Sequence, residues 1–218
     1  MTADLGRVAA RLFTAVLSDT LDGLGYRGQA LPPHIRPLDD GLVMAGRART
    51  GLYREVFHVE PGENPYELEI ALIDDLKPGE IAVLACGSSR RIAPGGELLS
   101  TASRARGAAG CVTDGFVRDI RATRAMRFPV FHGGIAPLDS KGRGKVAAID
   151  IPVEVGGVAI APGDLVFGDA DGVIAVPRAI ETQALEAAFA KVEGEDKTRE
   201  ALERGEKLAD VFERYGIL

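Results

Sequence analysis

The apolar positions of the first 24 residues recur at steps of three to five, which is the spacing of one face of a helix. They are Leu5, Val8, Leu12, Val16, Leu17, Leu21 and Leu24. This pattern predicts two short helices or one broken helix, with either Thr14 or Ser18 able to cap a second one. Glycine and proline then predict a loop over 25–37, and a strand is expected over 42–50.

Two units of helix followed by strand come next. Apolar residues share one helical face over 66–75, and the continuous apolar run 81–85 predicts a buried strand. A second helix is expected from 97 to about 109, followed by the short apolar run 111–112. That run is closed by Asp114-Gly115, which predicts a strand that ends in a tight turn. Helix and strand in this repeated order are typical of a layered α/β core.

The second half of the chain changes to short apolar runs separated by glycine turns, which predict strands. These runs cover residues 128–131, 146–149, 153–155, 158–160, 165–167 and 173–176. Together with the first half they predict an α/β fold with a layered, mixed and partly barrel-like sheet.

The pattern becomes helical again from 178 to about 204, with an apolar stripe among many charges. Gly194 is expected to interrupt this helix, because glycine is unfavourable inside helices. The segment 195–218 is strongly charged and has only a thin apolar stripe. Because such a helix has little to bury against its own domain, we expect it to pack on a neighbouring subunit.

The composition narrows the possible classes of protein. A chain of 218 residues with 46% hydrophobic content is long enough for one substantial domain, expected over 1–218. A net charge of −6 and the absence of tryptophan argue against a nucleic-acid partner. No run is long and apolar enough to span a membrane, and neither a secretory pattern nor a disulfide framework is visible. A cytoplasmic protein is therefore expected.

The stretch 95–119 is where chemistry is expected. Two glycines lead into a helix whose free N–H groups suit an anion, and Arg118 and Asp119 follow the next strand. Asp119 and Glu97 are able to hold a hard divalent cation, directly or through water, while Arg118 binds a carboxylate or neutralises an oxyanion. The alternative is an ordinary turn with a surface ion pair, in which Asp119 caps the helix 120–126.

Other polar residues are weaker candidates. Arg90 and Arg91 are able to capture an anion, although solvated loop arginines are the more common case. His34, His58 and His132 are too widely separated to form a recognisable metal motif. The acidic run 169–171 lacks the glutamate of a calcium loop and is better interpreted as a sharp turn.

The combination of motifs and their order resembles the RraA-like family, which includes the 4-hydroxy-4-methyl-2-oxoglutarate aldolases. The resemblance covers most of the chain. The segments that carry it are Gly96-Glu97-Leu98-Leu99, Arg106-Gly107-Ala108-Ala109-Gly110, Thr113-Asp114-Gly115-Phe116-Val117-Arg118-Asp119, Phe128-Pro129-Val130-Phe131, and the run from Pro162 to Val173.

The resemblance implies a fold like the swivelling phosphohistidine domain, in a homotrimer or a dimer of trimers with sites between subunits. It also implies a class II pyruvate aldolase acting on a small 2-oxo acid, with oxaloacetate decarboxylation as a side activity. Mg²⁺ or Mn²⁺ would be held by Asp119, by Glu97 through water, and by Glu195 of an adjacent subunit, with Glu193 as the alternative. Backbone groups from Gly96 to Leu99, specifically the N–H groups of Leu98 and Leu99, would bind the substrate carboxylate, and Arg118 would stabilise the enolate.

One position departs from the aldolase pattern. The Arg-Asp pair of those enzymes is followed, after two more residues, by a carboxylate, whereas this chain has Ala122 there. The departure is similar to family members without known aldolase activity, including the protein regulator of ribonuclease E. A trimeric regulatory protein without catalytic activity is therefore the alternative function.

Overall fold

Two separate helices form at the start of the chain, as the first of the two alternatives predicts. The computed structural model describes residues 4–217, with helices α1 (Leu5–Arg11) and α2 (Thr14–Gly23). Thr14 does not cap α2 with its own side chain. Its N–H and its hydroxyl instead donate to the Asp169 carboxylate, at 2.8 and 2.6 Å. A carboxylate at a helix start is favourable, and Asp169 therefore has a structural role, as the sequence predicts.

A mixed sheet forms the centre of the molecule, in the order β1-β5-β4-β3-β2-β9-β10, with β6 pairing along β2. Neighbours among β2, β3, β4 and β5 are parallel, and the other pairs are antiparallel. The bounds are β1 (Arg36–Pro37), β2 (Met44–Glu55), β3 (Glu80–Ala85), β4 (Gly110–Val117), β5 (Val130–Ile135), β6 (Gly144–Ile149), β9 (Leu165–Asp169) and β10 (Gly172–Val176).

The sheet curves until it is nearly closed. Residues 29–31 bond to β10 through Leu31 N–H to Val173 O at 2.9 Å and Ala175 N–H to Gln29 O at 3.0 Å. A few residues later the same segment forms β1, which pairs with β5 at the other edge. This strip of chain therefore joins both edges, and the expected barrel-like sheet is confirmed. The likeness to a swivelling phosphohistidine domain stays a prediction.

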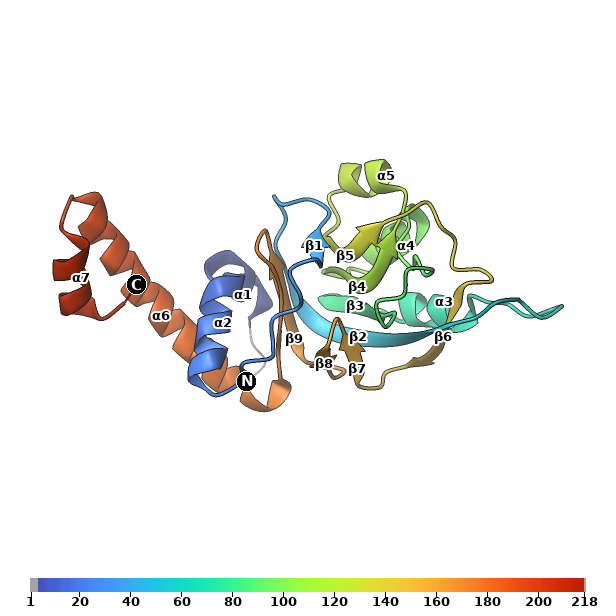
Figure 1. The fold of residues 1–218 in the computed structure, drawn as a ribbon, viewed down its shortest axis with the longest axis horizontal. Helices are drawn as coiled ribbons and strands as arrows, with labels where there is room; N and C mark the ends of the chain where they lie inside the picture. Colours follow the sequence, from blue (N-terminus) through green and yellow to red (C-terminus); the bar gives the residue numbers. More distant parts are fainter. Residues whose placement is uncertain (1–3, 218) are drawn as a thin grey trace.

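Helices cover two sides of the sheet (Figure 1). The crossover helices α3 (Glu67–Asp74), α4 (Glu97–Ala105) and α5 (Ile120–Ala125) connect the parallel strands and bury one apolar layer. Helices α1 and α2 pack with α6 (Glu181–Glu203) over β9 and β10. The ribbon of β7 (Val153–Val155) and β8 (Val158–Ile160) adds its valines and isoleucine to the interior of the near-barrel.

The prediction of a tight turn at Asp114-Gly115 is wrong. β4 continues to Val117, and its register against β5 shifts between Thr113 and Phe116, as in a β-bulge. The carboxylate of Asp114 is buried and accepts the N–H groups of Cys86 and Ser88, at 2.6 and 2.7 Å. The loop after β3 therefore satisfies the hydrogen-bonding capacity of this buried carboxylate, and Asp114 lies within a strand instead of a turn.

Gly194 does not interrupt the last long helix, so that expectation is also wrong. α6 is continuous from Glu181 to Glu203, and the side chain of Ile217 occupies the place where a Cβ at Gly194 would stand. The glycine therefore permits the close approach of the chain end. Figure 1 shows α6 extending away from the sheet, with α7 (Leu208–Tyr215) folded back along its outer part.

The outer part of α6 is covered only in part within its own chain. Ala201 and Val211 are buried where α6 and α7 meet, whereas Leu208 and Phe212 of α7 are exposed. Packing of the segment 195–218 on a neighbouring subunit stays a prediction, and its last residue lies outside the described residues.

Candidate functional site

Two glycines bring the start of α4 against the end of β4. A Cβ on Gly95 would stand 2.6 Å from Cγ1 of Val117, and the Arg118 N–H donates to the Gly95 carbonyl at 2.8 Å. A Cβ on Gly96 would stand 3.1 Å from Oδ2 of Asp119. A larger residue at Gly95 would press on Val117, and one at Gly96 would displace the side chains of Asp119 and Arg118, so the glycines allow a helix start and a strand end to meet.

Asp119 lies at this junction in a left-handed conformation, with φ 58°, which aspartate tolerates better than most residues. It precedes α5 but makes no side-chain cap to it. Its Oδ2 instead accepts a hydrogen bond from the Glu97 N–H at 3.2 Å, at the start of α4. The side chain of Asp119 therefore does not cap α5, so that part of the alternative interpretation is wrong.

Arg118 lies between two carboxylates. Its Nε is 3.8 Å from Asp119 Oδ2 and its Nη2 is 3.9 Å from Asp139 Oδ1, while Nη1 donates to the Leu138 carbonyl at 3.2 Å. The side chain remains 39% exposed. The guanidinium is thus held in place and still accessible to an anion.

These residues line one wall of a cavity of about 200 Å³, which is large enough for a small organic acid. The predicted residues on this wall are Gly96, Leu98, Leu99, Arg118 and Asp119. The first turn of α4 presents N–H groups that have no partner within the helix, and the Leu98 side chain is 79% exposed beside it. The predicted anion-binding residues are therefore adjacent to one another.

A buried carboxyl group also lines this cavity. Glu69 of α3 is only 5% exposed, and the Tyr53 hydroxyl donates to its Oε1 at 2.5 Å. Burial raises the pKa of Glu69, and the negative charge of Asp139 raises it further, against the opposing effects of the Tyr53 hydrogen bond and Arg118. Ionisation of Glu69 is therefore less favourable than ionisation of a solvent-exposed glutamate.

Asp139 lines the same cavity and is shifted in the other direction. Burial raises the pKa of Asp139, but the Lys141 N–H, the Tyr66 hydroxyl and the Arg118 charge together hold it below its usual value. The Tyr66 hydroxyl lies 3.0 Å from both carboxylate oxygens, and burial followed by this contact raises the pKa of Tyr66 to about 12. One cavity thus holds two acids whose pKa values are shifted in opposite directions.

The sequence motifs did not identify this second group of cavity residues. A signal existed for Glu69, which stands three residues before Leu72 on the apolar face of its helix, where an acid is unusual. Tyr66, Asp139 and the buried Ser140 come from turns and loops without periodicity, so nothing in their spacing indicated a common cavity.

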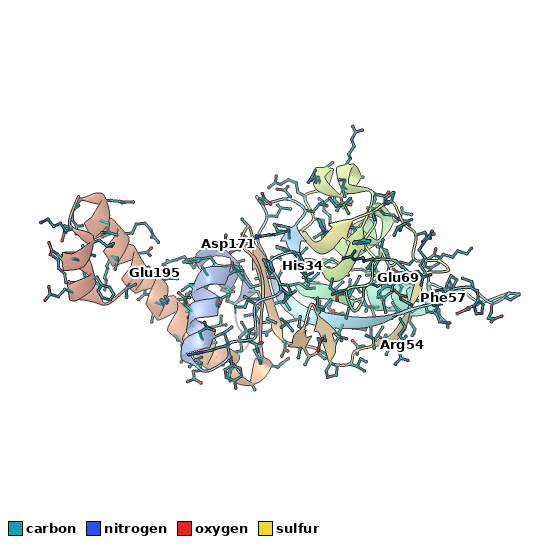
Figure 2. All side chains as sticks on the ribbon, viewed as in Figure 1. His34, Arg54, Phe57, Glu69, Asp171 and Glu195 are labelled. Carbon is teal, nitrogen blue, oxygen red and sulfur yellow. The ribbon has the colours of Figure 1, made fainter. Side chains whose placement is uncertain are left out.

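The candidate metal ligands are only partly brought together within one chain. Glu97 follows Gly96 at the start of α4, and its carboxylate accepts the Thr101 hydroxyl at 2.8 Å. Glu195 lies on α6, far from the body of the sheet and from Glu69 (Figure 2). Among residues 4–217, no three His, Cys, Asp or Glu side chains are grouped so as to hold a metal ion. The ligand set stays a prediction that requires a second subunit.

The weaker candidates lie elsewhere. Arg91 contacts Glu55 at 3.1 Å and stacks over the Phe57 ring at 4.1 Å, so its charge is engaged by its own chain. Arg90 is exposed on the same loop. The three histidines are spread over the molecule: His34 is exposed, His58 pairs with Glu60, and His132 is buried in β5. In the described part of the chain, no helix is long and apolar enough to cross a membrane.

Comparison with known proteins gives consistent matches. A family model described as RraA-like, Aldolase/RraA, matches residues 14–175. A putative 4-hydroxy-4-methyl-2-oxoglutarate aldolase of Halalkalibacterium halodurans is 36% identical over 187 residues, which are 86% of this chain and 82% of that protein. The 4-hydroxy-4-methyl-2-oxoglutarate aldolase of Thermus thermophilus is 29% identical over 157 residues, 72% of this chain and 90% of that enzyme.

Solved structures share the fold. RraAS2 of Streptomyces coelicolor, described as an unusual member of the RNase ES inhibitor RraA protein family, matches with a TM-score of 0.80 and 28% identity. The match covers 91% of this chain and 97% of that one. RraA from Thermus, described as an RNA-processing inhibitor, matches with a TM-score of 0.59 at 28% identity, covering 73% and 92%. Enzymes and regulators thus both occur among the similar proteins.

Proposed function

Because this chain belongs to the RraA-like family, whose model matches residues 14–175, we propose that it is a divalent-metal-dependent carbon–carbon lyase. It cleaves a 4-hydroxy-2-oxo acid to pyruvate through an enolate, and it decarboxylates oxaloacetate through the same enolate. The observation that carries the proposal is the placement of Arg118 and Asp119 beside the start of α4, on one wall of a cavity. The aldolases among its relatives support it.

The residues at the junction fit a hard divalent cation. Mg²⁺ and Mn²⁺ prefer carboxylate oxygens as ligands. The side chain of Asp119 is half exposed, and the glycine at position 96 leaves the space beside its carboxylate free of a Cβ. Asp119 would hold the metal with Glu97 through water and with Glu195, or alternatively Glu193, of an adjacent subunit. When bound there, the metal polarises the 2-oxo acid as a Lewis acid.

The chain itself binds and orients the substrate. The N–H groups of Leu98 and Leu99 at the start of α4 bind the substrate carboxylate, where the helix dipole also favours negative charge. The C4 hydroxyl loses its proton to water, the bond between C3 and C4 breaks, and a carbonyl forms at C4. The electron pair passes into the pyruvate enolate, whose oxygen the Arg118 guanidinium stabilises. A proton on C3 then completes pyruvate.

We also propose that the chain forms a homotrimer or a dimer of trimers with the site between subunits. Two observations support this. Within one chain, α6 carries Glu195 away from the sheet, so Asp119 and Glu195 meet only if they come from different copies (Figures 1 and 2). The exposed apolar side chains Leu208 and Phe212 of α7 are also available for packing on a neighbour.

The test of the lyase is pyruvate release from 4-hydroxy-4-methyl-2-oxoglutarate and from oxaloacetate in the presence of Mg²⁺. Asp119→Ala is expected to lose more than the roughly 100-fold that removal of an outer partner of a metal ligand typically costs. The exposed Asp40→Ala is the matched control and is expected to behave as the wild type. If the wild type turns over neither substrate, and Asp119→Ala is no different from it, the lyase proposal is wrong.

The alternative is a regulatory protein without catalytic activity, similar to the regulator of ribonuclease E. The exposed Ala122 on α5 favours it, because a methyl group stands where the aldolase pattern has a carboxylate. Similarity to RraAS2 also favours it. Salt-sensitive, stoichiometric binding to an RNase E-type endonuclease by a catalytically silent wild type would support this function, and pyruvate turnover without such binding would exclude it.

A further inference from the structure

Glu69 is a buried acid with one side open to the cavity that Arg118 and Asp119 border. Only 5% of its surface is exposed, and it lines the cavity together with residues at the start of α4. The Tyr53 hydroxyl, itself buried, donates to Oε1 at 2.5 Å and fixes the orientation of the carboxyl group. A carboxyl held in this way presents its second oxygen in one direction, which makes it suited to deliver a proton.

Burial, assisted by the charge of Asp139, raises the pKa of Glu69 by more than the Tyr53 hydrogen bond and Arg118 lower it. Tyr53 comes from β2, Cys86 directly follows β3, Cys111 lies on β4 and Arg118 follows it, while Tyr66 and Asp139 come from the adjoining turn and loop. Among these neighbours only Arg118 is positively charged. Its Nη2 is 3.9 Å from Asp139 Oδ1, so its charge also acts on Asp139 and not on Glu69 alone. Two acids in one cavity whose pKa values are shifted apart are the arrangement by which enzymes separate acid and base roles.

We propose that Glu69 is the proton donor that converts the pyruvate enolate to pyruvate at C3. The inference rests on the proposed lyase function, because the enolate is an intermediate of that reaction. It assigns a group to a step that the proposed roles of Arg118, Asp119 and Glu97 leave open, because Arg118 keeps its proton and stabilises the enolate oxygen, and the two carboxylates hold the metal.

The step balances in atoms and electrons. The electron pair of the enolate C2–C3 double bond forms a bond to the proton of Glu69, and the enolate oxygen pair re-forms the C2 carbonyl. Glu69 is left as a carboxylate, to which Tyr53 remains hydrogen-bonded, and it regains a proton from water that enters the cavity after pyruvate leaves. In reverse, the Glu69 carboxylate removes a proton from the methyl group of pyruvate.

The test follows the reverse step. With Mg²⁺ present, the wild type in D₂O is expected to exchange the methyl protons of pyruvate for deuterium, measured by proton NMR. Glu69→Gln keeps an acceptor for the Tyr53 hydroxyl but has no acidic proton, and exchange is expected to fall by about 100-fold or more. Glu67→Gln on the exposed side of the same helix is the matched control, and it is expected to exchange like the wild type.

A second readout separates chemistry from structural damage. Loss of carbon dioxide from oxaloacetate precedes protonation of the enolate, so Glu69→Gln is expected to retain more of its decarboxylation than of its exchange. A fold defect would lower both equally. Glu69→Asp, which keeps an acid on a shorter side chain, is expected to restore part of the exchange.

The two proposals fail in different ways. If the wild type neither releases pyruvate nor exchanges its methyl protons, the lyase function and the role of Glu69 both fail. If the wild type does both, and Glu69→Gln exchanges at the wild-type rate, only the assignment of Glu69 is overturned. An equal loss of decarboxylation and exchange in Glu69→Gln, with no restoration in Glu69→Asp, would also overturn it.

Discussion

Asp114 and Glu69 are both buried carboxyl groups, and their different partners give them different roles. Asp114 accepts two short hydrogen bonds from the backbone N–H groups of Cys86 and Ser88, so it anchors the loop after β3. Glu69 has a single hydroxyl donor and faces a cavity. Because one donor does not offset its burial, the pKa of Glu69 is raised, whereas the role of Asp114 is to hold two backbone N–H groups in place.

Asp114→Ala is expected to destabilise the fold by about 3 kcal/mol, because it leaves buried N–H groups without an acceptor. The free energy of unfolding from urea titration is the measurement. Asp171→Ala, at an exposed turn position, is the control and is expected to change the stability by less than about 0.5 kcal/mol. Equal stabilities for the two variants would show that the loop after β3 does not depend on Asp114.

Glu69 also makes stability depend on pH. Because the folded protein raises the pKa of Glu69 above the ordinary carboxyl value of 4.5, the folded state binds this proton more tightly than the unfolded state. Its contribution is fully present below 4.5 and is lost as the pH rises through the folded pKa.

Glu69→Gln, which does not ionise, is therefore expected to gain stability relative to the wild type as the pH rises above 4.5. Urea unfolding of both proteins from pH 4 upward, at intervals of about one unit, measures the difference. A difference that is independent of pH would contradict a raised pKa for Glu69.

At the scale of elements, the approach of α4 to the end of β4 positions the predicted residues. The meeting depends on the two glycines before α4, since a Cβ on Gly96 would lie 3.1 Å from Asp119 Oδ2 and 3.3 Å from Arg118 Nε. Both neighbours are side-chain atoms, and the backbone of Gly96 is extended, with φ −139°. A larger residue is therefore tolerated by the backbone but not by the site.

Gly96→Ala is accordingly expected to change stability by less than about 1 kcal/mol while lowering pyruvate release about 10-fold or more, since a shift of about 1 Å in a catalytic group has effects of that size. Thermal unfolding and steady-state kinetics measure the two effects. The control is Gly28→Ala, where a Cβ would meet open space. Wild-type kinetics in Gly96→Ala would show that Arg118 and Asp119 need not be held in this position.

At the scale of the whole molecule, α6 and α7 form an arm that extends away from the sheet. Its apolar side chains Leu208 and Phe212 stay exposed within one chain. The Thermus enzyme aligns with only 72% of this chain, whereas RraAS2 covers 91% of it. This chain is thus closer in extent to the longer members of the family. The proposed shared site gives the arm a function, because it carries Glu195 to another copy.

Mixed oligomers test that arrangement. Asp119→Ala and Glu195→Gln are each expected to be inactive alone, yet co-assembly in equal amounts restores about a quarter of the sites, since half of the subunits supply each intact ligand and neighbours combine at random. Pyruvate release by the mixture is the measurement. Asp119→Ala mixed with Glu97→Ala is the control that is expected to stay inactive, because both residues come from the same subunit. No recovery in the first mixture would exclude a site shared in this way.

The sequence by itself determined the elements and one wall of the site. Hydrophobic spacing predicted the two N-terminal helices and the short strands, and the order of the motifs predicted the family. These signals are local, because each depends only on residues that are close together in the sequence. Arg118, Asp119 and Glu97 were found because a glycine-led helix start and a strand end stand close together in the chain.

Only the tertiary structure decided which polar groups are buried together. The joining of the sheet edges by 29–37, the continuity of α6 past Gly194, and the bulge that buries Asp114 all depend on contacts between distant segments. The wall of Glu69, Tyr66 and Asp139 arises in the same way. The pKa and the hydrogen bonds of a buried acid depend on the groups that pack around it. These groups come from distant segments of the chain, so spacing along the sequence does not predict their contacts.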